Sequence, residues 1–269
     1  MRRSLVQLFI AVIFLIVSCA PRKSQSGVIS AGAIKVMTYN VHHCNPPGKP
    51  GVIDVDAIAA VIKQQRADMV AVQEVDVNTG RSGKISQAEQ LAAKAGYRFY
   101  YFGKAMDFDG GAYGVLLLSR YPLTDTVTYS LPRAGDKGGE PRVLAAATIA
   151  LPNGRSVRFG STHLEAYNNT SRILQVKEIS RIAGETALPF IVAGDWNATE
   201  GSEVIRILDA DFTRTCYQCP STFWEGGETG AIDYIALKPK DAFAILSHNV
   251  VQNKEASDHM PVIAEWQLK

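Results

Sequence analysis

Asp195 and Asn197 are a carboxylate and an amide whose types and spacing suit catalysis. They follow the apolar run Pro189–Ala193, which predicts a short buried strand, and Gly194 permits a sharp turn where that strand ends. Because strand side chains alternate, Asp195 and Asn197 point the same way and Trp196 points into the core. A carboxylate beside an amide can hold a water molecule against an electrophile and orient a phosphoryl oxygen. An isolated pair of this kind is more often a surface turn, so the interpretation depends on the rest of the chain.

Polar side chains capable of catalysis also stand at one end of nearly every other predicted strand. They are Asn40, Glu74, His163, Asp233 and the adjacent pair Asp258-His259. Strand ends are rigid, and a site is commonly assembled on such positions. Each residue alone fits a hydrogen-bonded structural role, but so many together in one chain favour a shared site.

The residue types fit one kind of chemistry. Glu74 offers hard oxygen ligands, which suit Mg²⁺ or Mn²⁺ rather than zinc. His163 and His259 can contact a charged phosphate, and Asp195 can orient or deprotonate a water molecule. The chain has no Gly-x-Ser-x-Gly nucleophile motif and no glycine-rich nucleotide loop. We therefore expect direct attack of water on phosphorus, without a covalent enzyme intermediate.

Six short motifs, in order along the chain, resemble those of the endonuclease/exonuclease/phosphatase superfamily. They are Met37-Thr-Tyr-Asn40, Gln73-Glu74, Ser161-Thr-His163-Leu, Gly194-Asp-Trp-Asn197, Ile232-Asp233-Tyr and Ser257-Asp-His259. The superfamily includes pancreatic-type deoxyribonucleases, abasic-site endonucleases, inositol polyphosphate 5-phosphatases and bacterial sphingomyelinases. The resemblance implies an α/β (α+β) fold, a four-layered sandwich of two face-packed mixed β-sheets flanked by helices. The one departure is Trp196, where the superfamily usually has Phe.

The resemblance also implies a metal site. Glu74 would be the principal ligand of Mg²⁺, with Mn²⁺ as an alternative ion. Asn40 would help to bind the ion, and Asp258 would be a further ligand.

The same resemblance assigns catalytic roles. Asp195 would position and activate the attacking water, and Asn197 would orient that water or the scissile phosphate. His259, held by Asp233, would contact the phosphoryl oxygens, and His163 would bind the phosphate from the other side. Metal and imidazolium together would stabilise the negative charge that in-line attack builds up.

Several further candidates carry a weaker signal. Arg142 could bind phosphate, although an arginine at a strand start is more often solvated or involved in sheet pairing, and Arg81 could also face the cleft. Arg172-x-x-Gln175 resembles a motif of bacterial hydrolases in the superfamily.

Three histidines outside the motifs have no assigned role. His42 and His43 follow Asn40 directly, so one of them could approach the site, but structural roles are favoured. His248 is expected in a polar loop.

Hydrophobic periodicity predicts one catalytic domain over residues 33–269 that contains both helices and strands. The predicted helices are 52–66, capped by Asp54, and 85–95, 171–184 and 202–208. The predicted strands are 34–41, 68–73, 98–102, 113–119, 127–131, 143–151, 157–163, 189–194, 232–237 and 260–266.

The N-terminus is typical of a targeting segment. Arg2 and Arg3 precede an apolar stretch from Leu5 to Val17, which is the length of a signal-peptide core, so residues 1–18 are predicted to be a signal peptide. The sequence around Cys19 resembles a bacterial lipobox, which implies acylation of its thiol and a flexible, lipid-anchored tether over residues 19–32. We therefore expect an exported, membrane-anchored outer-membrane lipoprotein of the cell envelope. The alternative is an ordinary signal peptide with a coincidental cysteine.

The remaining cysteines suggest a local disulfide. Cys216 and Cys219 are spaced as Cys-x-x-Cys, and no second such pair or histidine pair accompanies them, which argues against zinc. In an exported protein a loop disulfide is favoured, and Cys44 is left buried and free.

Charge and composition limit the classes of substrate that we expect for this protein. The 269 residues are 46% hydrophobic, which is enough for a sizeable core, and without residues 1–18 the chain carries 26 basic and 26 acidic residues. A neutral domain has no global field that attracts a long polyanion, so nucleic acid is not the favoured partner. Phe223 and Trp224 could form the exposed apolar hairpin of a sphingomyelinase-like enzyme, but core or cleft packing is favoured.

We expect a monomeric, divalent-metal-dependent phosphodiesterase that acts on a small or lipid-derived phosphoester substrate. The main alternative is a nuclease on DNA or RNA, and the other is a non-catalytic surface binding module. The sequence leaves open the number of metal ions and whether the substrate is a diester or a monoester.

Overall fold

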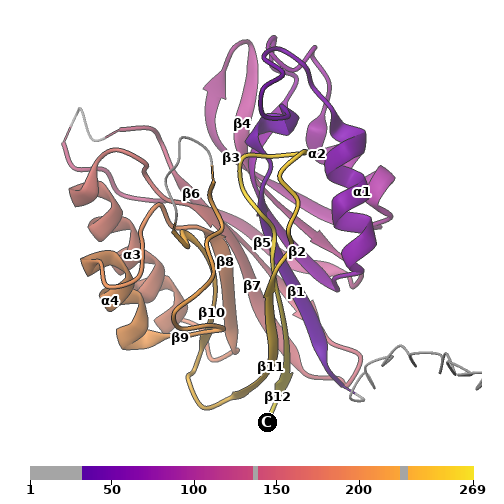
Figure 1. The fold of residues 1–269 in the computed structure, drawn as a ribbon. Helices are drawn as coiled ribbons and strands as arrows, with labels where there is room; N and C mark the ends of the chain where they lie inside the picture. Colours follow the sequence, from indigo (N-terminus) through magenta and orange to yellow (C-terminus); the bar gives the residue numbers. More distant parts are fainter. Residues whose placement is uncertain (1–31, 136–138, 225–229) are drawn as a thin grey trace, which may run out of the picture. The chain divides into compact units, whose positions relative to one another are not determined.

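The computed structural model describes residues 32–135, 139–224 and 230–269. The residues from Gly32 to Lys269 form one unit (Figure 1). The predicted signal peptide, Cys19 and the tether up to residue 31 lie outside the described residues. Among the described residues, no helix is both long and apolar enough to cross a membrane.

The first sheet contains six strands in the order β11-β12-β1-β2-β4-β3. Its strands are β1 (Ile34–Asn40), β2 (Met69–Val77), β3 (Phe99–Phe108), β4 (Gly111–Ser119), β11 (Phe243–Val250) and β12 (Val262–Leu268). β1 and β2 run parallel, and the other neighbours pair antiparallel.

The second sheet also contains six strands, in the order β5-β6-β7-β8-β10-β9. Its strands are β5 (Leu123–Ser130), β6 (Val143–Ala150), β7 (Ser156–His163), β8 (Phe190–Asp195), β9 (Thr213–Arg214) and β10 (Asp233–Lys238). Here β7 and β8 form the parallel pair. Each sheet therefore holds one central parallel pair.

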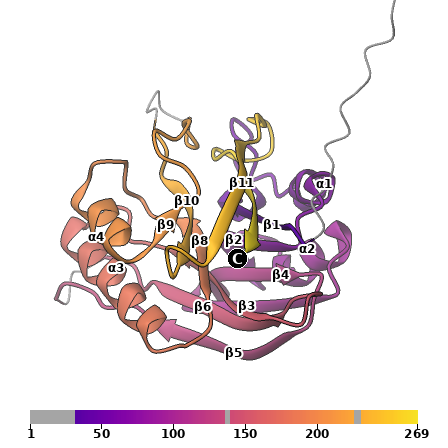
Figure 2. The same cartoon turned by 90° about the horizontal axis from the view of Figure 1, so that it is seen from below.

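Helices cover the outer face of each sheet, as Figures 1 and 2 show. α1 (Val55–Gln65) and α2 (Gln87–Ala95) pack on the first sheet, and α3 (Asn169–Gly184) and α4 (Glu203–Asp211) pack on the second. Each helix begins after a side chain that caps a backbone N–H, and these caps are Asp54, Ser86, Asn168 and Ser202. The four-layered sandwich of mixed sheets expected from the sequence is confirmed.

The described residues form a main core between the sheets, a small separate cluster of Val115, Val143 and Ala145, and one core under each helix layer. Side chains that alternate along β1 and β2 meet those of β7 and β8 between the sheets, among them the fully buried Val36, Met69, Phe159 and Ile191. Trp196 is also fully buried, but it lies in the core between the second sheet and the helices α3 and α4. The prediction that Trp196 points into a core is therefore confirmed.

A buried polar bridge joins the two sheets beside the strand ends that carry the predicted site. Gln73 on β2 donates from Nε2 to Ser161 Oγ on β7 at 3.1 Å, and its Oε1 accepts from Thr38 Oγ1 at 3.2 Å. Ser161 Oγ in turn donates to the Val72 carbonyl at 3.3 Å. Because unpaired polar groups in this core would be costly, these bonds favour one alignment of the sheets.

The structure corrects the sequence expectation at β11 and β9, which were not predicted. His248 lies within β11 rather than in a polar loop, and its Nδ1 is 2.9 Å from Thr215 Oγ1. β11 is an edge strand whose register shifts between Ile245 and Ser247, so its sequence lacks a regular alternation. β5 also begins at Leu123, four residues before its predicted start.

Close packing at Gly194 generates a stability prediction. A Cβ at Gly194 would overlap the Thr162 carbonyl oxygen on the neighbouring strand, so we expect Gly194→Ala to lower the free energy of unfolding by about 1–3 kcal/mol. At Gly184 the nearest atom to an added Cβ is Lys238 Nζ at 3.8 Å, and Gly184→Ala serves as the matched control. Urea denaturation measures both, and equal midpoints for the two variants would contradict the packing argument.

Candidate active site

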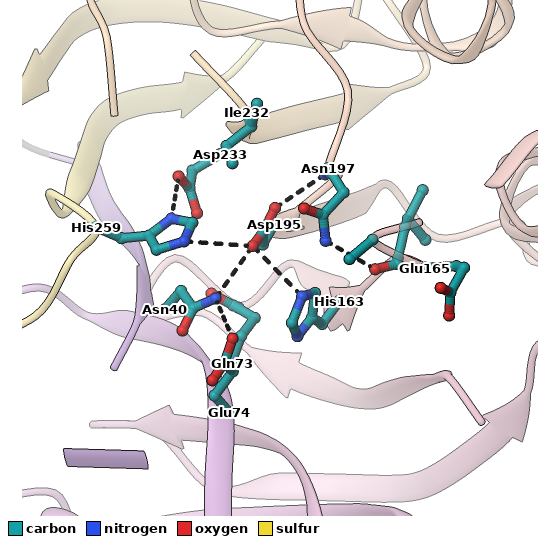
Figure 3. Close-up of polar contacts among 12 residues, drawn as sticks. Asn40, Gln73, Glu74, His163, Glu165, Asp195, Asn197, Ile232, Asp233 and His259 are labelled. Atoms are coloured by element: carbon teal, nitrogen blue, oxygen red, sulfur yellow. Dashed lines mark hydrogen bonds and ion pairs between the residues drawn. The ribbon is translucent and has the colours of Figure 1, made fainter. Parts of the chain in front are cut away.

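The parallel strand pairs bring the predicted site residues to one end of the sandwich. Asn40 ends β1 in register with Gln73 of β2, and His163 ends β7 opposite Asp195, the last residue of β8. Asp233 begins the antiparallel β10 opposite the same Asp195. Figure 3 shows these side chains converging.

A bulge in β2 turns Glu74 toward this site. The pairing of β2 with β4 shifts between Val72 and Val75, and Glu74 has a φ of 59°, in the left-handed region. The extra residue lets Gln73 stay between the sheets while Glu74 faces the cavity. A bulge is a common device for re-aiming one side chain of a strand beside a functional site.

The site is a cavity of about 380 Å³ at these strand ends. The predicted site residues that line it are Glu74, Arg142, His163, Asp195, Asn197, Asp258 and His259. Asn40 and Asp233 stand directly behind it, bonded to Asp195 and His259 respectively. The structure therefore brings every predicted catalytic, substrate-binding and metal-binding residue together.

Asp195 is the centre of the polar network, and only 1% of it is exposed. Its Oδ2 accepts from Asn40 Nδ2 at 3.0 Å, and the Nε2 atoms of His163 and His259 lie 3.4 and 3.7 Å from it. Its Oδ1 accepts from the Asn197 backbone N–H at 2.9 Å. Burial and the nearby charge of Asp233 raise the pKa of Asp195 to about 7.

His259 is held in its charged form by a buried carboxylate. Its Nδ1 lies 2.9 Å from Asp233 Oδ2, and Thr222 Oγ1 donates to the same oxygen at 2.6 Å. Burial opposes the charge, but the charge and hydrogen bond of Asp233 raise the pKa of His259 to about 10. The imidazolium Nε2–H therefore faces Asp195 and the cavity.

His163 is held in the opposite state by a buried cation. Arg142 Nη1 lies 3.0 Å from His163 Nδ1, and because guanidinium only donates, Nδ1 must accept. The ring proton then sits on Nε2, toward Asp195. Burial and the charge of Arg142 push the pKa of His163 well below its usual range. His163 is therefore a neutral imidazole with both nitrogens directed at protein groups.

Arg142 is neither solvated nor merely a sheet-pairing residue. It is 5% exposed, lines the cavity and forms an ion pair of 3.0 Å with Glu140. It joins the polar network around Asp195 through His163. Direct phosphate binding by Arg142 or His163 stays a prediction.

The two amides of the site have defined orientations. Asn40 Oδ1 accepts from the His42 backbone N–H at 3.0 Å, so its Nδ2 faces Glu74 Oε1 and Asp195 Oδ2, both at 3.0 Å. Asn40 would have to turn its amide over to bind an ion through oxygen, so its ligand role stays a prediction. Asn197 Nδ2 donates to the Leu164 carbonyl at 2.9 Å, which leaves Oδ1 as the acceptor for a water molecule.

The donor set fits a hard divalent cation. Carboxylates of Glu74, Asp195 and Asp258 line one cavity, and oxygen ligands of this kind suit Mg²⁺ or Mn²⁺. Burial opposes ionisation of Glu74, but the neighbouring His43, the hydrogen bond from Asn40 and the charge of His259 hold the pKa of Glu74 well below its ordinary value. Asp195, Asp233 and His259 also form a compact group, but the proton between His259 and Asp233 would compete with an ion there. Binding of the ion by Glu74 and Asp258 stays a prediction.

Two hydroxyl residues that sequence reasoning missed support the site. Thr222 Oγ1 accepts the backbone N–H of Asp233 at 3.2 Å while donating to its carboxylate. Ser257 Oγ donates to the Asn40 carbonyl at 2.8 Å and accepts from the His259 N–H at 3.3 Å. Ser257 is the first residue of the motif Ser257-Asp-His259, although no role was predicted for it, whereas Thr222 has no signal in its local sequence.

The loop after His163 is fixed by residues outside the predicted site. The buried Glu165 accepts from the Glu140 backbone N–H at 2.9 Å. Arg172 donates to the Glu165 carbonyl at 2.9 Å, and Gln175 accepts from the Glu165 N–H at 2.9 Å. The Arg172-x-x-Gln175 motif thus positions the loop whose Leu164 carbonyl orients Asn197.

Two of the remaining sequence candidates, Arg81 and Phe223, line the cavity. Arg81 lines the cavity, with its Nε and Nη2 held by Asp76 at 2.7 and 2.9 Å. Phe223 also lines it, with its ring 4.9 Å from that of His259, so cleft packing is confirmed for this residue. Cys216 and Cys219 form the expected disulfide, and Cys44 is buried and free.

The two histidines are predicted to differ in charge in the metal-free protein. His163 should be neutral with its proton on Nε2 near neutral pH, and His259 should stay doubly protonated until the pH approaches about 10. Long-range ¹H–¹⁵N NMR in the presence of EDTA distinguishes these states, with His163→Gln and His259→Gln assigning the signals. A charged His163 or a neutral His259 near neutral pH would contradict the network.

Comparisons with solved structures reveal similar folds. An endonuclease/exonuclease/phosphatase from Beutenbergia cavernae DSM 12333 matches with a TM-score of 0.74 and 25% identity, over 88% of this chain and 72% of that one. A mannosyl-6-phosphatase of Bacteroides thetaiotaomicron VPI-5482 matches with a TM-score of 0.69 and 16% identity, over 87% of this chain and 99% of that one. The human nocturnin catalytic domain matches with a TM-score of 0.69 and 18% identity, over 90% and 95% of the two chains.

Comparison of the sequence with protein families identifies one family that contains the motifs of the site. No curated protein matches this sequence. The model of the Endonuclease/Exonuclease/phosphatase family matches residues 37–259, which include every motif described above. The chain therefore belongs to the endonuclease/exonuclease/phosphatase family of phosphoester hydrolases.

Proposed function

We propose that this protein is a divalent-metal-dependent phosphodiesterase that hydrolyses a small or lipid-derived substrate by direct attack of water. The observation that carries the proposal is the environment of Asp195, a buried carboxylate with a pKa raised to about 7. A general base with such a pKa is suited to neutral pH. Asp195 also lies between a charged and a neutral imidazole, and the Nε2 atoms of both rings face its Oδ2.

In this mechanism Asp195 accepts a proton from a water molecule that Asn197 Oδ1 orients. The water oxygen bonds to phosphorus, the bond from phosphorus to the leaving oxygen breaks, and the leaving oxygen takes up a proton from solvent. His259 donates Nε2–H to a phosphoryl oxygen as negative charge develops. A divalent ion held by Glu74 and Asp258 would supply Lewis-acid stabilisation of the same charge.

A second cavity supports a diester as the substrate. It has a volume of about 360 Å³ and shares Ala166, Asn197, Phe223 and His259 with the first cavity. A phosphodiester carries a substituent on each of two oxygens, and two cavities that meet at Asn197 and His259 can take one substituent each. The predicted lipid anchor at Cys19 would hold the enzyme beside phospholipids, which supports a lipid-derived substrate.

A substrate panel tests the reaction class. We expect metal-loaded protein to release product from bis-p-nitrophenyl phosphate or a phospholipid headgroup, to lose this activity in EDTA, and to lose it in Glu74→Ala. Supercoiled plasmid should remain intact, and p-nitrophenyl phosphate should be the poorer substrate. Nicking of plasmid that depends on Glu74 would establish the nuclease alternative instead. A lack of metal-dependent hydrolysis across the whole panel would favour a binding module.

The pKa of Asp195 generates a pH prediction. Because only the ionised carboxylate acts as a base, kcat/KM should rise about tenfold per pH unit on the acid side and level off above a pH of about 7. Asp195→Asn should lower the rate by about 10²–10⁴-fold and abolish this acid limb. Asp107→Asn, at an exposed carboxylate outside the cavity, is the matched control and should keep both rate and profile. An Asp195→Asn variant that retained the acid limb would show that another group is the base.

A further inference from the structure

The second cavity differs from the first in the charge of the residues that line it. No described residue that lines the second cavity carries a carboxylate, whereas the cations Arg172 and His259 both line it. The first cavity, in contrast, is lined by the four carboxylates of Glu74, Glu140, Asp195 and Asp258. The first cavity therefore suits a metal ion, and the second suits a negatively charged group.

The guanidinium of Arg172 lacks a carboxylate partner. Its Nη1 donates to the carbonyls of Glu165 and Ala166 at 2.9 and 2.6 Å, and no described carboxylate forms an ion pair with it. Its Nε is buried without a hydrogen-bond partner, and Nη2 makes only a long bond of 3.4 Å to Asn169 Oδ1. Guanidinium groups can only donate, so Nη2 is the donor of Arg172 that is left for a ligand.

The pKa of Arg172 reflects this lack of compensation. Burial lowers the pKa of Arg172, although the charges of Glu165 and Asp195 oppose that shift. Burial also opposes the charge of Arg81, but there the hydrogen bonds to Asp76 raise the pKa. An anion bound in the second cavity would supply the nearby negative charge that Arg81 has and Arg172 does not.

Two helices also begin at the second cavity. α3 and α4 lie side by side on the second sheet (Figures 1 and 2). Asn169, the first residue of α3, and Ser202, whose side chain caps α4, both line the cavity. The first N–H groups of a helix have no partners within the helix, and its dipole is positive at that end. Both helices therefore add to the positive potential that Arg172 creates in the cavity.

We propose that the second cavity is an anion subsite, and that the substrate carries a second anionic group, a phosphate or a carboxylate, on one substituent of the scissile phosphoester. Asn197 and His259 line both cavities, so a phosphoester bound in the first cavity has its neighbouring substituent in reach of the second. The inference rests on the proposed function, because it specifies the substituent that the second cavity takes in that reaction. An uncharged substituent would leave the charge of Arg172 without a partner.

Phosphonates test the subsite without turnover, because the proposed reaction does not cleave a carbon–phosphorus bond. Isothermal titration calorimetry on the full chain with Mg²⁺ compares propylphosphonate, propane-1,3-diphosphonate and 3-phosphonopropionate. Propylphosphonate has an uncharged substituent, and the other two ligands carry a second phosphonate or a carboxylate. At least one of these two should bind about tenfold or more tightly than propylphosphonate, because hydrogen bonds to charged groups are strong. The tighter of the two identifies the preferred anion.

Two substitutions add a negative charge to the subsite and keep its local hydrogen bonding. Ser202→Asp retains a side-chain oxygen that can cap α4. Asn169→Asp retains the oxygen that accepts from Arg172 Nη2 and supplies the missing carboxylate. Each substitution should reduce the advantage of the second anionic group at least about threefold. The matched control is Ser86→Asp, which adds the same charge at the cap of α2, lines neither cavity and should retain the advantage.

The outcomes separate this inference from the proposed function, and thermal unfolding checks that every variant is folded. Equal affinities of the wild type for the three phosphonates, or an advantage that both Asn169→Asp and Ser202→Asp retain in full, overturns the inference. Metal-dependent hydrolysis of bis-p-nitrophenyl phosphate in the same preparation then shows that the proposed function survives. If the wild type hydrolyses no diester but the two substitutions do reduce the advantage, the proposed function fails and the anion subsite stands.

Discussion

The structure depends on one electrostatic constraint, which is the burial of the Asp195 carboxylate at the meeting point of both sheets. A buried carboxylate is costly unless hydrogen bonds or opposite charges compensate it. Here Asn40, the Asn197 backbone, His163 and His259 all direct N–H groups at it. These donors come from β1, the turn after β8, β7 and the loop before β12, so the carboxylate is satisfied only when the two sheets are correctly aligned. The fold and the proposed catalytic chemistry are linked through this group.

His163 and His259 illustrate how neighbouring groups, rather than residue type, determine the charge state of a side chain. Both rings are buried and both present Nε2 to the same oxygen of Asp195. One is backed by a carboxylate and is charged, and the other is backed by a guanidinium and is neutral. Exchanging Asp233 or Arg142 for a neutral residue would therefore change the charge state of a histidine beside Asp195, the proposed base, without removing any residue that contacts Asp195. Such paired but opposite environments are a recurrent way to separate acid and base roles.

Much of the site could be predicted from sequence because strand ends and their polar residues are local features. Asn40, His163 and Asp195 each follow an apolar strand, and parallel pairing then brings them to one edge. Contacts between distant segments were not predictable. Thr222 donates to the Asp233 carboxylate from 11 positions earlier in the chain, and the tautomer of His163 depends on Arg142, 21 positions before it. The irregular edge strand β11 was missed because its bulge breaks the alternation on which strand prediction relies.

The central claim is that water attacks phosphorus directly, with Asp195 as the base and without a phosphorylated enzyme. The stereochemistry at phosphorus tests this most directly. A single-isomer phosphorothioate diester is hydrolysed in ¹⁸O-labelled water, and the configuration of the labelled product is compared with that of the substrate. One in-line displacement predicts inversion of configuration. Retention would require two successive displacements through a covalent intermediate and would contradict the account.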